Sequence, residues 1–129
     1  MLLPLTSIYA ALLGLLLVVL SMNVSRVRGV AKVSLGDGGH KGLIHAIRAQ
    51  GNFIEYVPMA VILIALAEGQ NAPAVAIHVL GVALVAGRVL HALGLARANA
   101  PMAFRFVGSL TTYLVILLTA LGLLVHRLF

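Results

Sequence analysis

The length of the uncharged apolar segments is the feature of this sequence that most constrains its fold. No residue from Met1 to Ser25 carries a charge, and Leu12 to Leu20 is almost entirely aliphatic. A helix needs about 20 such residues to cross the hydrocarbon core of a bilayer. Because this stretch has neither a basic start nor a small-residue cleavage site, we interpret residues 3–24 as a retained membrane span and not as a signal peptide.

Three more segments of similar length follow along the chain. The second is polar in its first turns and apolar from Tyr56 to Ala67, and the third is interrupted only by His78, Arg88 and His91. Short polar connections separate the segments, and Pro73 is typical of a helix start. The expected spans are residues 3–24, 43–68, 73–95 and 105–125. The sequence therefore predicts an all-α integral membrane bundle of four transmembrane helices, forming a single domain over residues 1–129.

The composition excludes several other classes of protein. Hydrophobic residues make up 62% of the chain and charged residues only 9%, against about 45–50% and roughly 25% in soluble domains. The net charge of +6 comes without tryptophan and with few aromatic residues for base stacking, so we expect no nucleic-acid partner. Cysteine is absent and no three residues have metal-ligand spacing, so no metal is expected and thiol chemistry requires a thiol brought by a substrate.

The connections predict the orientation in the membrane. The glycines of Gly36-Asp37-Gly38-Gly39 indicate a turn, and no Gly-Lys-Ser/Thr follows to make it a phosphate loop. Basic residues gather at one side, in the first loop with its helix ends and in the third connector, whereas Arg127 stands alone opposite. The gathered residues are Arg26, Arg28, Lys32, Lys41, Arg48, Arg97 and Arg105. By the positive-inside rule, loops one and three face the cytoplasm and both termini lie on the other side.

Polar residues inside the spans are the candidates for function, because ionisable groups are costly in a bilayer. Arg48, Asn52 and Glu55 share one face of the second helix. Similar alignments occur at Arg88 and His91 on the third helix and at Arg105, Ser109 and Thr112 on the fourth. Small residues along the third helix, Gly81, Ala83, Gly87 and Gly94, predict close helix packing.

Two interpretations of these polar residues are open. In one, they are interhelical ion pairs that hold the bundle together, such as Glu55 with Arg88. In the other, arginines that outnumber the single intramembrane carboxylate bind an anionic small molecule. The remaining acids, Asp37 and Glu68, are expected to be solvated, and the other histidines are expected to have no special role.

One segment resembles a known family signature. Residues Arg48 to Pro58, R-A-Q-G-N-F-I-E-Y-V-P, closely resemble the second-helix motif of the MAPEG family, the membrane-associated proteins of eicosanoid and glutathione metabolism. The likeness extends to the S-R-V-R that ends the first span, to R-V-L-H at 88–91 and to Arg105. The turn at residues 36–39 and the short chain are most similar to the small bacterial inner-membrane branch.

This resemblance implies a homotrimer that binds glutathione between subunits on the cytoplasmic side. It implies that Arg105 is catalytic and stabilises the thiolate. The residues implied in binding the tripeptide are Arg26, Arg28, Arg48, Asn52, Glu55, Tyr56, Arg88 and His91. The ligand's chemistry fits these roles, because its two carboxylates suit arginines and its ammonium suits Glu55.

Two functions follow from the resemblance. The first is a glutathione-dependent transferase or peroxidase that acts on a lipophilic electrophile from the bilayer. The second is a non-catalytic scaffold or regulator that keeps the fold. The chain departs from the family at Leu95, where several members have a tyrosine, and at Phe106, where the prostaglandin synthase branch has a serine. A specific eicosanoid synthase is therefore not expected.

Overall fold

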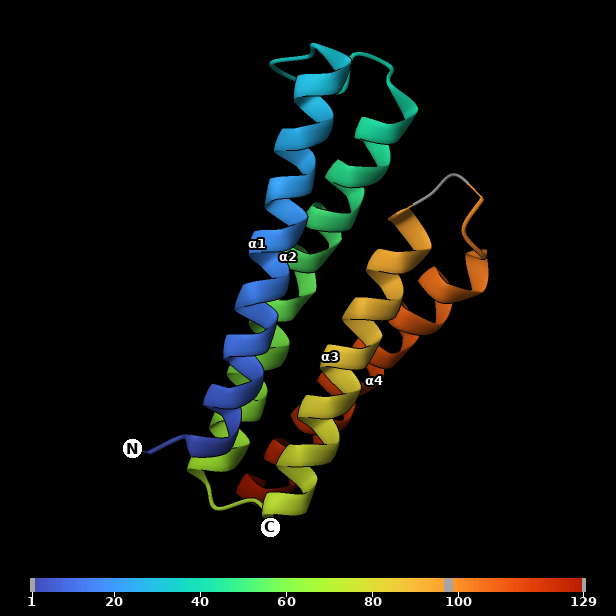
Figure 1. The fold of residues 1–129 in the computed structure, drawn as a ribbon. Helices are drawn as coiled ribbons and strands as arrows, with labels where there is room; N and C mark the ends of the chain where they lie inside the picture. Colours follow the sequence, from blue (N-terminus) through green and yellow to red (C-terminus); the bar gives the residue numbers. More distant parts are fainter. Residues whose placement is uncertain (1, 97–98, 129) are drawn as a thin grey trace.

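The computed structural model describes residues 2–96 and 99–128, and these form an all-α bundle (Figure 1). The helices are α1 (Pro4–Ala31), α2 (Lys41–Gly69), α3 (Ala74–Ala96) and α4 (Met102–Leu128). Each is long and apolar enough to cross a membrane. The predicted four-helix membrane bundle is thus confirmed. α1, α2 and α4 are longer than the predicted apolar spans, and α3 is shifted by one residue. Arg97, which contributed to the predicted orientation, lies outside the described residues.

The helices alternate in direction, so the chain ends near where it begins (Figure 1). The α1–α2 and α3–α4 connections lie at one end, and the two termini lie at the other with the α2–α3 connection. α1 packs on α2 and α3, and α4 packs on the same two helices. α2 and α3 therefore form the middle of the bundle.

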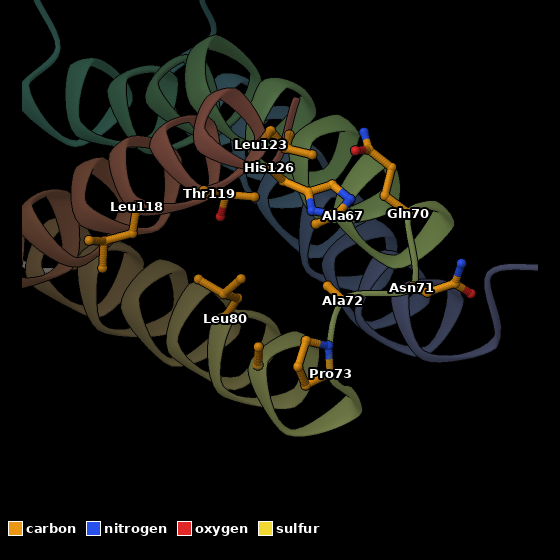
Figure 2. Close-up of a pocket in the computed structure, with 12 residues that line it drawn as sticks. Ala67, Gln70, Asn71, Ala72, Pro73, Leu80, Leu118, Thr119, Leu123 and His126 are labelled. Carbon is orange, nitrogen blue, oxygen red and sulfur yellow. The ribbon is translucent and has the colours of Figure 1, made fainter. Parts of the chain in front are cut away.

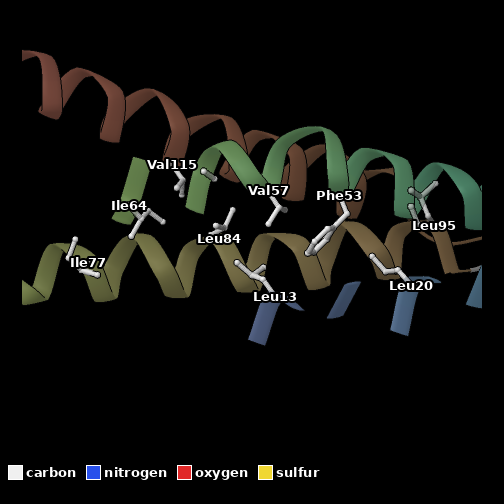
Figure 3. Close-up of a cluster of buried hydrophobic side chains, with 11 residues drawn as sticks. Leu13, Leu20, Phe53, Val57, Ile64, Ile77, Leu84, Leu95 and Val115 are labelled. Atoms are coloured by element: carbon white, nitrogen blue, oxygen red, sulfur yellow. The ribbon is translucent and has the colours of Figure 1, made fainter. Parts of the chain in front are cut away.

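The main buried cluster is aliphatic apart from the ring of Phe53. Phe53 and Ile64 of α2, Leu84 of α3 and Leu13 of α1 belong to one buried cluster that runs along the bundle (Figure 3). Outward positions such as Leu15 and Leu118 are also large and apolar, and they are exposed. Apolar side chains on both the inner and outer surfaces are what a lipid environment requires.

Close contact between α3 and α4 depends on glycines. A Cβ on Gly108 would lie 2.5 Å from the carbonyl oxygen of Gly87, and a Cβ on Gly94 would lie 2.8 Å from the backbone nitrogen of Arg105. A Cβ on Gly81 would overlap the ring of Tyr9 in α1. The prediction that small residues on the third helix serve close packing is confirmed at Gly81, Gly87 and Gly94.

The α1–α2 connection is the predicted glycine turn. Gly36, Gly38 and Gly39 all have positive φ, a conformation that glycine adopts without steric cost. The Asp37 carboxylate accepts a hydrogen bond from the backbone nitrogen of Gly39 at 2.9 Å. Arg28 donates to the carbonyl oxygen of Gly36 at 2.7 Å and so ties the end of α1 to the turn.

Glu68 has a role that the sequence analysis did not predict. Its two carboxylate oxygens accept hydrogen bonds from the backbone nitrogens of Leu5 at 2.9 Å and Thr6 at 2.7 Å. The first amides of a helix have no partner within the helix and carry partial positive charge. Because α1 has no side-chain cap of its own, Glu68 supplies one from the end of α2. The expectation of a solvated Glu68 missed this contact, although the side chain is not buried.

Candidate functional site

A polar pocket of about 360 Å³ lies near the end of the bundle that holds the α1–α2 and α3–α4 connections. Three helices contribute to it. Its lining residues are Ile44, His45, Arg48 and Asn52 from α2, His91 and Leu95 from α3, and Arg105 from α4. Four of the predicted site residues therefore share one cavity, with basic side chains and no acidic side chain among the lining residues.

The pocket forms because the polar faces of the helices meet. Arg48 and Asn52 are one turn apart on α2 and project to the same side. Close packing at Gly94 holds the start of α4 against the end of α3 and brings Arg105 near His91. The Nε atom of Arg105 is buried without a hydrogen-bond partner, so this donor is unused within the chain.

Glu55 lies beside the pocket and not in its wall. Its carboxylate is 3.7 Å from Nη1 of Arg48, and the two side chains are 48% and 59% exposed. This is the one ion pair among residues 2–96 and 99–128. The Glu55–Arg88 pair predicted under the structural interpretation is not formed. A half-exposed carboxylate with one long contact remains accessible to a cationic group of a ligand.

Arg88 lies behind the pocket wall and is only 1% exposed. Its Nη2 donates to Oδ1 of Asn52 at 2.8 Å and contacts Nδ1 of His91 at 3.2 Å. Its Nη1 lies 3.4 Å from Oγ1 of Thr112, and its guanidinium carbon lies 5.8 Å from the centre of the Phe53 ring. Arg88 and His91, one turn apart on α3, thus belong to a hydrogen-bond network that joins α2, α3 and α4.

Two tyrosines lie near the same face. The rings of Tyr56 in α2 and Tyr113 in α4 meet edge to face with centroids 5.2 Å apart. Tyr56 was among the predicted site residues, whereas Tyr113 was not. The available signal for Tyr113 was its position as the one tyrosine of the fourth span, directly after Thr112.

Arg26 and Arg28 lie apart from this pocket within the chain. Arg26 is exposed and donates to Oδ1 of Asn23 at 2.9 Å, and it lines a separate groove of about 370 Å³ between α1, α2 and α3. Arg28 is engaged by the α1–α2 turn. A single chain does not bring these two residues together with Arg48 and Asn52.

Two histidines for which no special role was expected have different surroundings in the structure. His45, for which no special role was expected, lines the polar pocket one turn before Arg48. His78 pairs through Nδ1 with the Tyr9 hydroxyl at 2.6 Å, which is a structural contact. The signal for His45 was its i, i+3 spacing to Arg48 on the polar first turns of the helix.

A cavity of about 400 Å³ opens at the opposite end of the bundle (Figure 2). It lies between the α2–α3 connection and the last turns of α4. Leu80, Leu118 and Leu123 form much of its wall, and Thr119 and His126 add polar atoms. No arginine or carboxylate lines it, so it lacks the charged groups that make the polar pocket a candidate site.

Comparison with known proteins agrees with the second-helix motif. Residues 6–125 match the MAPEG family. The inner membrane protein YecN of Escherichia coli K12 is 40% identical over 89 residues, which are 69% of this chain and 68% of YecN. YecN of E. coli O6:H1 strain CFT073 is similar to the same extent. The chain therefore belongs to the MAPEG family of membrane proteins.

Proposed function

We propose that this protein is a glutathione-dependent transferase or peroxidase of the bacterial inner membrane, acting on a lipophilic electrophile. The observation that carries the proposal is the pocket in which Arg48 and Arg105 meet without an acidic residue in the wall. Guanidinium groups in a partly buried site favour carboxylates or other anions as partners. Family membership supports glutathione as the source of those anions.

The charges around the pocket match the tripeptide. Arg48 suits a carboxylate, and the accessible carboxylate of Glu55 suits the α-ammonium group. Asn52 can hydrogen-bond to the peptide backbone of the ligand. Arg105, with its unpartnered Nε, is proposed to lie near the sulfur and favour the thiolate over the thiol.

Arg26 completes the proposed site from a neighbouring subunit. Within one chain it faces a groove that does not include Arg48 or Asn52. A homotrimer that places this groove against the polar pocket of the next subunit would bring Arg26 to the ligand. The proposed orientation puts this end of the bundle on the cytoplasmic side, by the distribution of Lys and Arg.

The chemical step is nucleophilic attack by the thiolate. In the transferase reaction, a C–S bond forms as the bond to the leaving group breaks, and the leaving group keeps the electron pair. In the peroxidase reaction, the sulfur attacks the O–O bond to give an alcohol and a sulfenic acid, and a second glutathione then yields the disulfide and water. Arg105 contributes by holding the negative charge on sulfur before attack.

A non-catalytic role is the second candidate, and one residue favours it. Leu95 lines the pocket where several family members have a tyrosine, so a hydroxyl donor to the sulfur is missing at that position. A protein of this kind would bind the tripeptide and act as a scaffold or regulator. Catalysis in the first candidate has to depend on Arg105 and its neighbours instead.

Turnover by the purified protein in detergent tests the proposal. We expect conjugation of glutathione to chlorodinitrobenzene, or reduction of a lipid hydroperoxide. Arg105→Ala is expected to lower the rate about 10- to 100-fold near neutral pH, because the thiolate fraction falls with each unit by which the pKa of the thiol rises. Arg127→Ala, a matched loss of charge at the far end of α4, leaves the rate unchanged. Glutathione binding without turnover of either substrate would refute catalysis and favour the scaffold.

A further inference from the structure

Arg88 is a fully buried cation whose contacts are all neutral. Among the described residues, its side chain meets Asn52, His91, Thr112 and the ring of Phe53. A buried arginine inside a membrane bundle is costly, and here no carboxylate offsets the cost. Because Arg88 does not line the pocket, a direct contact with a ligand does not explain it either.

The chemistry of arginine fixes the hydrogen-bonding roles of its neighbours. A guanidinium group has five N–H donors and no acceptor. The oxygen of Asn52 must therefore face Arg88, which leaves the NH₂ group of the amide unused by this contact. Nδ1 of His91 must accept as well, which requires the neutral ring with its hydrogen on Nε2.

The far side of the guanidinium is held in the same way. The hydroxyl of Thr112 donates to the carbonyl oxygen of Gly108 at 2.9 Å. Its oxygen is then left to accept from Nη1 of Arg88. With the Phe53 ring against the guanidinium, all three helices around the pocket keep Arg88 in one position.

We propose that Arg88 is a positioning residue that sets the hydrogen-bonding polarity of the pocket. It turns Asn52 and His91, both of which line the pocket, into N–H donors for whatever binds there. Arg48 and Arg105 also offer only N–H donors, so the wall of the pocket favours an anionic group over a cationic one. His91 is then a fixed neutral donor and not a general base. The identity of the ligand as glutathione rests on the proposed function, but the role of Arg88 does not.

Nitrogen-15 NMR of histidine-labelled full-length protein in detergent tests the positioning directly. The chain has five histidines, and His91→Gln assigns the signal of His91. We expect one tautomer in the wild type, with Nε2 protonated and Nδ1 bare, and a mixture of tautomers in Arg88→Met. A wild-type signal with Nδ1 protonated, or an unchanged tautomer in Arg88→Met, would overturn the proposal.

Asn52→Asp provides a second test if Arg88→Met does not fold. The aspartate still accepts a hydrogen bond from Arg88, so the unfolding temperature is not lowered. The aspartate also replaces the NH₂ donor of Asn52 with a negative charge. We expect the affinity for glutathione to fall by about tenfold or more, while Asn71→Asp at the far end leaves it unchanged. Wild-type affinity in Asn52→Asp would refute the donor role. If wild-type protein does not bind glutathione, the proposed function fails, and the NMR result still decides the role of Arg88.

Discussion

Gly108→Ala is expected to separate α3 from α4 and so to damage the bundle and the pocket together. The added Cβ would lie 2.5 Å from the carbonyl oxygen of Gly87 and 2.7 Å from Cβ of His91. Ordinary van der Waals contacts begin near 3.4 Å. The obstacle is backbone and not the end of a flexible side chain, so the helices have to move apart by about 1 Å, and overpacking of this kind costs about 1–3 kcal/mol.

Gly122→Ala is the matched control on the same helix. Nothing lies within 4 Å of a Cβ at that position. Both variants gain about 0.5–1 kcal/mol from replacing glycine by alanine in a helix, so their difference in unfolding free energy isolates the steric term. We expect Gly108→Ala to be less stable than Gly122→Ala by about 1–3 kcal/mol.

The functional effect follows from what the two helices carry. His91 and Arg88 belong to α3, whereas Arg105 and Thr112 belong to α4, and the Arg88–Thr112 contact is already long at 3.4 Å. We expect Gly108→Ala to weaken glutathione binding and Gly122→Ala to leave it unchanged. Unfolding followed by circular dichroism in detergent, with titration calorimetry, measures both effects. Equal stability and equal affinity in the two variants would refute this reasoning.

Three further predictions concern the helix cap, the carboxylate and the assembly. Glu68→Ala is expected to lower the temperature of unfolding, because two backbone amides of α1 lose their acceptor. Glu68→Gln is expected to lower it less, and thermal unfolding of both variants checks this, with wild-type stability in both as the contrary result. Glu55→Gln is expected to weaken glutathione binding more than about tenfold. The unfolding temperature is expected to stay the same, because the ion pair with Arg48 is long and exposed. Calorimetry and thermal unfolding measure the two effects, and a loss of both affinity and stability would mean that the ion pair is structural. Native mass spectrometry in a mild detergent is expected to give the mass of three subunits, and a monomer that still binds glutathione would rule out a site shared between subunits.

The sequence predicted the fold well because membrane spans are encoded locally. Apolar length alone located all four helices, and the polar stripe on α2 identified Arg48 and Asn52 as neighbours. Helical periodicity tells which residues share a face, but not which helix that face meets. The cap that Glu68 provides for α1 joins residues 62 and 63 positions apart, and no local pattern indicates such a contact.

The same limit explains what was missed at the site. Arg88 was correctly grouped with His91, but its burial behind the pocket depends on how closely α3 approaches α4. His45 lay within the predicted span of residues 43–68, but helical periodicity did not show that its side of α2 meets α3 and α4 at the pocket. Arg26 lies in a separate groove because α1 packs on α2 and α3. The polar pocket lies between α2, α3 and α4, where Arg105 is the lining residue from α4.

The central claim is that the polar pocket binds a thiol tripeptide and holds its sulfur as a thiolate. Titration of glutathione into the detergent-solubilised wild type, followed by the ultraviolet absorbance of the thiolate, tests both parts at once. We predict saturable binding with thiolate formed near neutral pH, well below the reference thiol pKa of about 8.5. Absence of binding, or binding with the sulfur still protonated, would contradict the claim.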